Sequence, residues 1–169
     1  MSNKYTPLQQ LNTVHMNLIG GFSKYITEIT SGREVSAASW HFIPAYTMYN
    51  IEAFQDLRDY FERKRISIKK QKFLDCGCGI GNVMLTYMRI MEIGDENIYG
   101  IDHNQEALII ANSAFGFTNL IHQDLFKFEK YDEFDVIYFY QPFHNYNLQW
   151  EFEDHVISKV KPGTVIISH

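Results

Sequence analysis

The chain has 169 residues, enough for one globular domain with a sizeable core. Hydrophobic residues make up 46% of it and charged residues 21%, a balance that excludes a disordered or collagen-like chain. With 15 basic against 20 acidic residues the formal net charge is −5, which disfavours general binding to nucleic acid. No apolar run approaches the roughly 18 residues of a membrane span, and no signal-peptide core is present. We therefore expect a cytoplasmic protein without a membrane segment.

The first seventy residues have a helical pattern. Apolar residues recur at near-helical spacing from Leu8 to Ile29, and Ser31-Gly32 breaks the pattern. A second helix with Asn50 as its N-cap is indicated by one apolar stripe. This stripe consists of Ile51, Phe54, Leu57 and Phe61. We predict a helical N-terminal segment over residues 1–70 and a second domain over residues 71–169.

From Lys72 onward, short apolar runs alternate with helical patterns. The predicted strands are Lys72–Asp75, Asn97–Asp102, Leu120–Gln123, Phe134–Tyr140 and Thr164–Ser168. The clearest helices between them are Asn82–Met91, Gln105–Phe115 and Trp150–Val160. Strands that alternate with helices are typical of a parallel sheet with right-handed crossovers. The sequence therefore predicts an α/β fold with a doubly wound parallel sheet.

A glycine-rich turn follows the first predicted strand, in the segment Leu74-Asp75-Cys76-Gly77-Cys78-Gly79-Ile80-Gly81. Alternating glycines let the backbone turn sharply and approach a ligand closely. The third glycine comes one residue too early for the dinucleotide fingerprint, and the Asp75 carboxylate would repel a pyrophosphate but attract an ammonium or sulfonium group. No Gly-Lys-Ser/Thr follows, which excludes a Walker phosphate loop. The turn thus favours a positively charged nucleoside and disfavours a nicotinamide oxidoreductase.

Two further acids end the next two predicted strands. Asp102 lies 21 residues beyond Gly81, a position suited to accepting both hydroxyls of a ribose. Asp124 ends the following strand and is placed to accept from an exocyclic amine. Because ligands of an open parallel sheet bind at the carboxyl ends of its strands, Asp75, Asp102 and Asp124 are expected to converge on one cleft.

These motifs, in this order, resemble those of class I S-adenosylmethionine-dependent methyltransferases over residues 72–169. Leu74–Gly81 resembles the first motif, Gly100-Ile101-Asp102 the second and Gln123-Asp124 the third. The resemblance implies a Rossmann-like sheet of strand order 3-2-1-4-5 and S-adenosylmethionine as cofactor, with S-adenosylhomocysteine as product. It also implies a list of cofactor-binding residues: Asp75, Gly77, Cys78, Gly79, Gly81, Asp102, His103, Gln123, Asp124 and Tyr140.

The resemblance places the acceptor site at Tyr140-Gln141-Pro142-Phe143-His144. Relatives that methylate amino groups carry an Asn/Asp/Ser-Pro-Pro-Tyr/Phe tetrapeptide here, and this chain keeps only one proline and the aromatic residue. The amide of Gln141 is a candidate acceptor for a substrate amine, and His144 is a candidate base. A rigid loop without a catalytic role is the alternative. Methyl transfer to a protein or small-molecule acceptor is the leading hypothesis, and a non-catalytic cofactor-binding or scaffold subunit is its rival.

Three further expectations complete the prediction. Tyr46 and Thr47, in an aromatic linker, resemble a lid segment over the methionine end of the cofactor, although the alternative that the linker's aromatics simply pack the N-terminal helices is favoured. Cys76 and Cys78 are expected to be reduced, and no metal site is expected because no second Cys/His pair has ligand spacing. The predicted sheet ends after its fifth strand, where a complete family sheet has seven. That edge is expected to be masked by the N-terminal region, to pair with another copy as a homodimer, or to be continued by a longer natural chain.

Overall fold

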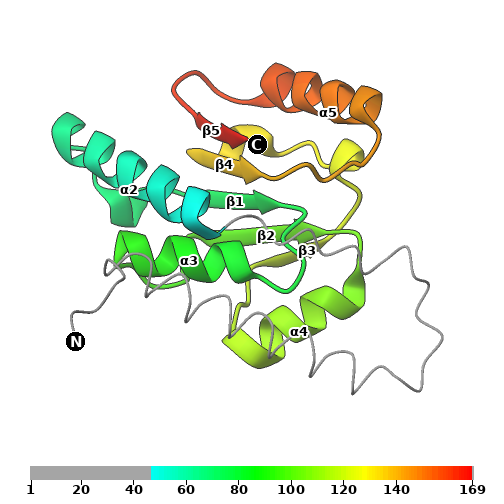
Figure 1. Cartoon of the computed structure of the whole chain (residues 1–169), viewed down its shortest axis with the longest axis horizontal. Helices are drawn as coiled ribbons and strands as arrows, with labels where there is room; N and C mark the ends of the chain where they lie inside the picture. Colours follow the sequence, from blue (N-terminus) through cyan, green and yellow to red (C-terminus); the bar gives the residue numbers. More distant parts are fainter. Residues whose placement is uncertain (1–46, 169) are drawn as a thin grey trace, which may run out of the picture. The chain divides into compact units, whose positions relative to one another are not determined.

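The computed structural model describes residues 47–168 (Figure 1). The chain divides into two compact units, residues 1–52 and residues 53–169, and only residues 47–52 of the first are described. Tyr46 lies outside the described residues, and Thr47 is the first residue of a helix. The predicted boundary at residue 70 and the lid assigned to the N-terminal segment therefore remain predictions.

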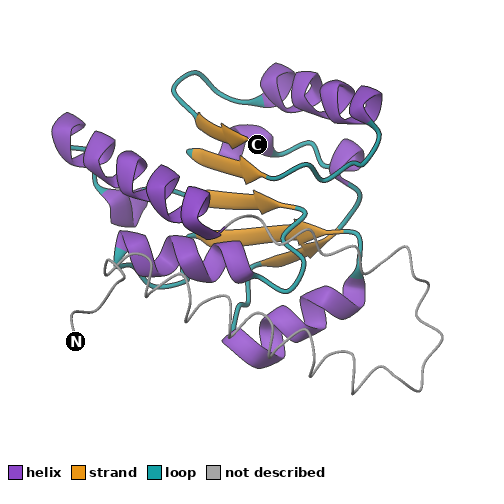
Figure 2. Ribbon diagram, in the orientation of Figure 1, coloured by secondary structure: helices purple, strands orange, loops and turns teal. Residues whose placement is uncertain are grey.

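Helices and strands alternate along the described part of the chain (Figure 2). The helices are α2 (Thr47–Lys64), α3 (Asn82–Met91), α4 (Gln105–Phe115) and α5 (Tyr146–Lys159). The strands are β1 (Phe73–Cys76), β2 (Ile98–Asp102), β3 (Leu120–His122), β4 (Val136–Phe139) and β5 (Val165–Ser168). Short 3-10 turns lie at η2 (Ile68–Lys70), η3 (Leu125–Lys127) and η4 (Tyr131–Glu133).

The five strands form one parallel sheet of order β3-β2-β1-β4-β5, which confirms the predicted fold class. The central strand β1 pairs with β2 on one side and with β4 on the other, so that Asp75 lies opposite Gly100 and Tyr138. Because all strands are parallel, their carboxyl ends lie along one edge of the sheet. The glycine turn after β1 and Asp102 at the end of β2 both lie at this edge.

Each face of the sheet is covered by its own apolar cluster, as expected of strands buried on both sides. On one face Phe73 of β1 stacks on Tyr87 of α3, with ring centroids 3.8 Å apart, and Phe54 of α2 packs edge-on against Tyr87. On the other face Phe139 of β4 packs against Phe152 of α5. Successive residues of a strand point to opposite faces, which places Asp75 on the same face as Phe73.

Element boundaries differ from the prediction at several places, and strands β1, β2, β4 and β5 each shift by one or two residues at an end. The expected N-cap Asn50 lies inside α2, because the helix begins three residues earlier at Thr47. Helix α5 begins at Tyr146 instead of Trp150, since Asn145 caps it by accepting a hydrogen bond from the backbone N–H of Asn147 at 2.9 Å. The third strand ends at His122, so Gln123 and Asp124 belong to the turn that follows. Helices α3 and α4 have the predicted bounds.

Candidate functional site: the glycine turn and the strand ends beside it

The glycine turn runs from Gly77 to Gly81 and adopts a backbone that favours glycine. Gly77, Gly79 and Gly81 have φ angles of 80°, 52° and 87°, in the left-handed region. The backbone N–H groups of Gly77 and Cys78 both donate to the carbonyl of Ile101, at 2.8 and 3.1 Å, which anchors the turn to the end of β2. Its far end, Gly81, is the N-cap of α3. The predicted loop between β1 and α3 is thus a turn whose backbone is held against the end of β2 by hydrogen bonds.

Gly100 of β2 allows the turn and α3 to pack closely against the sheet. A Cβ built at Gly100 would lie 2.6 Å from the Met84 sulfur and 2.7 Å from the Cys78 sulfur. A Cβ at Gly81 would come within 3.0 Å of the Phe117 ring. Cys78 is therefore a small buried side chain that packs against Gly100.

The Asp75 carboxyl is buried immediately before the turn. Its side chain is 2% exposed, and Oδ2 has no hydrogen-bond partner among the described residues. Burial, and secondarily the charge of Asp102, raises the pKa of this carboxyl well above its usual value. Among the described residues no ion pair links Asp75 to a lysine or arginine. A buried acid without a partner is costly unless a ligand supplies one.

Asn82, the first residue of α3, carries a second unpartnered polar atom. Its Nδ2 is buried and has no hydrogen-bond partner among the described residues. The residue directly follows Gly81, so the turn has an unpartnered acceptor at its start and an unpartnered donor at its end. The sequence prediction missed Asn82 because it treated this position only as a departure from the dinucleotide fingerprint. The asparagine directly after the last glycine was the available signal.

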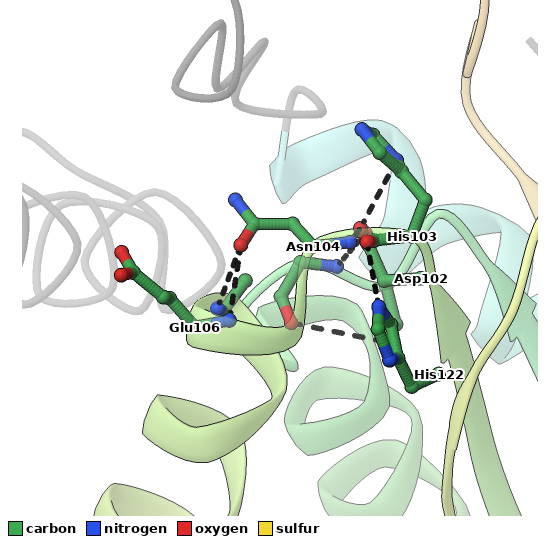
Figure 3. A network of polar contacts seen from close by, with 8 residues as sticks. Asp102, His103, Asn104, Glu106 and His122 are labelled. Atoms are coloured by element: carbon green, nitrogen blue, oxygen red, sulfur yellow. Dashed lines mark hydrogen bonds and ion pairs between the residues drawn. The ribbon is translucent and has the colours of Figure 1, made fainter. Parts of the chain in front are cut away.

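Asp102 ends β2 and holds two backbone segments with its two oxygens. Oδ2 accepts from the N–H of Gly79 and Oδ1 from the N–H of Asn104, each at 2.8 Å. His103 lies beside it, with Nδ1 3.5 Å from Oδ1 and a side chain that is 80% exposed (Figure 3). Asn104 then caps α4 by accepting from the N–H groups of Glu106 and Ala107. Asp102 therefore connects the glycine turn to the start of the next helix.

Gln123 and Asp124 lie in the turn after β3. The backbone N–H of Gln123 donates to the carbonyl of Asp102 at 3.1 Å, which brings the two strand ends together. The Asp124 carboxylate accepts from the N–H of Phe126 at 2.8 Å and caps η3, while the Gln123 amide donates to the carbonyl of Lys127. His122 contacts the carbonyl of His103 through Nε2 at 2.9 Å (Figure 3). Asp124 is exposed and has a local structural role, while its expected contact with an exocyclic amine stays a prediction.

The loop between β4 and α5 contains the predicted acceptor residues. Tyr140 is half-buried, whereas Gln141 and His144 are exposed. Gln141 has a φ of 38°, a strained value for a residue with a side chain, and such strain is common at functional loops. The buried Gln149 of α5 supports this loop: its Oε1 accepts from the N–H of Phe143 at 3.4 Å and its Nε2 donates to Glu153 at 2.8 Å.

The two cysteines are free thiols inside the fold. Cys76 and Cys78 are 2% and 6% exposed, and burial together with the charge of Asp75 raises the pKa of both thiols. Within residues 47–168 no group of three or more His, Cys, Asp or Glu side chains is arranged to hold a metal ion. Within the same range no helix has the length and apolar content needed to span a bilayer.

Comparison with known proteins places this architecture in a family. The family described as "Methyltransferase domain" matches residues 73–163, from β1 to the turn before β5. The chain belongs to this methyltransferase domain family, and its sheet is the Rossmann-like sheet of class I S-adenosylmethionine-dependent enzymes. A comparison with curated protein sequences finds no match.

Solved structures show the same fold at low sequence identity. An S-adenosylmethionine-dependent methyltransferase from Clostridium acetobutylicum is 19% identical, with a TM-score of 0.52 over 89% of this chain and 56% of that one. The sugar N-methyltransferase KedS8 from Streptoalloteichus is 13% identical, with a TM-score of 0.54 over 86% and 52%. The plantazolicin methyltransferase BpumL, crystallised with a triazolic desmethylPZN analog and S-adenosylhomocysteine, is 20% identical, with a TM-score of 0.50 over 91% and 56%. The chain thus spans about half the length of the structures it matches.

Proposed function

We propose that the protein is an S-adenosylmethionine-dependent methyltransferase that acts on a protein or small-molecule acceptor. The observation that carries this proposal is a pair of polar atoms at the two ends of the glycine turn that have no hydrogen-bond partner within residues 47–168, Asp75 Oδ2 and Asn82 Nδ2. An acceptor and a donor placed in this way suit the ammonium and carboxylate groups of an amino acid. The methionine end of the cofactor carries both groups.

The electrostatics of the site support the same ligand. Asp75 and Asp102 are both buried acids that no lysine or arginine pairs with in the described part of the chain, and the charge of Asp102 adds to the cost of ionising Asp75. A cationic ligand relieves this repulsion, whereas a pyrophosphate would add to it. Gly77, Gly79 and Gly81 have positive φ angles, which favour glycine. Because glycine has no side chain, the backbone of the turn can approach the proposed ligand closely.

The remaining cofactor contacts follow from the resemblance. Asp102 accepts from the ribose hydroxyls, and Asp124 with Gln123 reads the adenine amine. His103 lines the adenine, and Tyr140 lies beside the reactive end. Tyr46 and Thr47 are proposed as part of a lid. When bound, S-adenosylmethionine supplies an electrophilic methyl group on a positively charged sulfur.

The residues after β4 are proposed to position the acceptor. The Gln141 amide oxygen accepts from a substrate amine, and the strained backbone of Gln141 is of the kind found at functional loops. His144 is the proposed base when the nucleophile starts protonated. An amine on a small molecule or peptide is supported by the neighbours, which include a sugar N-methyltransferase and the plantazolicin methyltransferase. The two unpaired thiols support a cytoplasmic location.

Calorimetric titration of S-adenosylmethionine and S-adenosylhomocysteine into the full chain tests the proposal. We expect micromolar binding, about 8 kcal/mol, to wild type and no measurable binding to Asp102→Ala. The exposed acid of α5 gives a matched control, Asp154→Ala, which should bind as wild type does. A folded wild-type protein that binds neither compound would overturn the proposal. Binding without formation of S-adenosylhomocysteine across a screen of amine acceptors would favour the non-catalytic cofactor-binding subunit.

A further inference from the structure

The loop between β4 and α5 lies directly against the glycine turn. It runs from the carboxyl end of β4 to the start of α5, over residues 140–145 (Figure 1). A Cβ built at Gly77 would lie 3.4 Å from the Cβ of Pro142, so the proline of this loop meets the first glycine of the turn. Asp75 lies two residues before Gly77, on the strand that pairs with β4. The loop therefore borders the proposed site for the methionine end of the cofactor.

Gln149 is a polar residue in the buried stripe of α5. It is 5% exposed and precedes Phe152 and Val156 by three and seven residues, a spacing that places all three on one face of the helix. Phe152 and Val156 pack in the apolar cluster on this side of the sheet. A leucine would cover the sheet equally well, whereas a buried amide is costly unless it is hydrogen-bonded. Packing alone therefore does not explain a glutamine at this position.

Both ends of the Gln149 amide are hydrogen-bonded, and the two partners fix its orientation. Nε2 donates to Oε1 of Glu153 at 2.8 Å, one turn further along α5. Because a carboxylate only accepts, the amide nitrogen faces Glu153 and the amide oxygen faces the loop. There Oε1 accepts from the backbone N–H of Phe143 at 3.4 Å. Glu153, Gln149 and Phe143 thus form a chain of contacts that ends one residue from Pro142.

The loop has a strained backbone that contacts outside it must hold. Gln141 has a φ of 38°, a value that persists only where the surrounding structure enforces it. Phe143 supplies two kinds of contact to α5. Its ring packs against Phe152, with centroids 5.4 Å apart, and its N–H is held by Gln149. The ring fixes the side chain of Phe143, and Gln149 fixes its backbone.

We propose that Gln149 is a positioning residue, which holds the loop between β4 and α5 against the glycine turn at the methionine end of the cofactor, and that Glu153 orients its amide. The inference rests on the proposed function, which assigns this end of the site to the cofactor. Gln149 acts through Phe143 and Pro142. When its amide is lost, the loop relaxes away from Gly77, and the cofactor loses a preformed side of its site.

An exchange of amide and carboxylate between positions 149 and 153 tests the chain of contacts. Gln149→Glu places two carboxylates opposite each other, whereas Glu153→Gln keeps an acceptor for Nε2 of Gln149. In the double variant the amide at position 153 donates to the carboxylate at position 149, which still accepts from Phe143. Gln149→Leu removes the acceptor without adding a charge. Glu151→Gln changes an exposed acid of the same helix and is the matched control.

The exchange rate of the Phe143 amide proton with water, measured by NMR on the ligand-free full chain, reports on the loop alone. We expect exchange about tenfold faster or more in Gln149→Leu and Gln149→Glu. Glu153→Gln, the double variant and the control should stay within about threefold of wild type. An unchanged rate in folded Gln149→Leu would overturn the proposal. A folded double variant that exchanges as fast as Gln149→Glu would overturn it as well.

Calorimetric titration with S-adenosylmethionine reports on the site. Gln149→Leu and Gln149→Glu should bind about fivefold more weakly or worse, and the double variant should regain the lost affinity. Because the titration is run well below the melting temperature, a loss of global stability alone leaves the measured Kd unchanged. Faster exchange at Phe143 with unchanged affinity would refute the role at the cofactor. A wild-type protein that binds no cofactor would instead overturn the proposed function, and the exchange rates would still decide whether Gln149 holds the loop.

Discussion

The carboxylate of Asp102 accepts a hydrogen bond from the backbone N–H of Gly79 across 2.8 Å, which joins the end of β2 to the middle of the glycine turn. The same carboxylate is proposed to hold the ribose of the cofactor. A carboxylate oxygen accepts more than one hydrogen bond, so the turn and a ligand hydroxyl can share it. The residue proposed to bind the ribose therefore also holds the glycine turn in place.

This shared role predicts that Asp102→Ala affects stability as well as binding. Loss of the carboxylate leaves the N–H groups of Gly79 and Asn104 without their acceptor, which is expected to cost about 1–3 kcal/mol of unfolding free energy. Urea titration of the ligand-free protein measures this change. The exposed acid variant Asp132→Ala should stay within about 0.5 kcal/mol of wild type. An unchanged midpoint for Asp102→Ala would contradict the structural role.

Asp75→Asn is expected to stabilise the ligand-free protein while it weakens cofactor binding. Burial raises the folded-state pKa of Asp75 above its unfolded value, so wild type loses stability as the pH rises from about 4 through the raised pKa. The asparagine does not ionise and avoids this loss. At pH 7 we expect a gain of about 1 kcal/mol, seen as a melting temperature about 2–4 °C higher. Below about pH 4 the two proteins should melt alike, and a variant that melts lower at pH 7 would refute the explanation.

Cofactor binding is expected to release a proton from Asp75. The raised pKa favours the protonated carboxyl in the ligand-free protein, and an ammonium or sulfonium group favours the carboxylate. Affinity for S-adenosylmethionine should therefore increase with pH up to the raised pKa and level off above it. Calorimetry in two buffers of different ionisation enthalpy counts the released protons. Asp75→Asn is the control and should release none at this site, and equal proton release from both proteins would rule out Asp75 as the source.

Gly100→Ala is expected to destabilise the fold because the new methyl group has no room. It would collide with the sulfurs of Met84 and Cys78, which are buried under the glycine turn. Overpacking of this kind costs about 1–3 kcal/mol. Gly94→Ala is a matched control, since the atoms nearest its methyl group belong to the carboxylate end of the exposed Glu96 side chain, which can move away. Thermal melts of the two variants should differ by several degrees, and equal melts would count against the packing argument.

The sheet and most of its helices could be predicted from the sequence because their signals are local. Helices α3 and α4 carry clear apolar periodicity, and Gly81 and Asn104 mark their starts. The start of α5 at Tyr146 could not be predicted from periodicity, since the exposed Tyr146 and Trp150 add apolar residues to the water-facing side. The cap at Asn145 was a usable signal that was missed.

The candidate site was predictable at the level of residue types and not at the level of contacts. Strand ends locate Asp75 and Asp102 because a parallel sheet aligns its carboxyl ends. Nothing local indicates that the Asp102 carboxylate holds the Gly79 N–H, or that the buried Asn82 Nδ2 has no hydrogen-bond partner within residues 47–168. These facts depend on how β1, β2 and α3 meet. The roles of the predicted site residues remain predictions until binding is measured.

The central position of β1 has a consequence for the synthesis of the chain. The N–H of Lys72, next to β1, donates to the side chain of Asp135, next to β4, across 63 residues of sequence. At about 5–20 residues per second, a ribosome needs roughly 3–12 s to translate that interval. During this time β1, β2 and β3 can pair, but the apolar edge of β1 that awaits β4 stays uncovered. A nascent chain stalled before Val136 should therefore bind chaperones more strongly than one from which β4 (Val136–Phe139) has emerged.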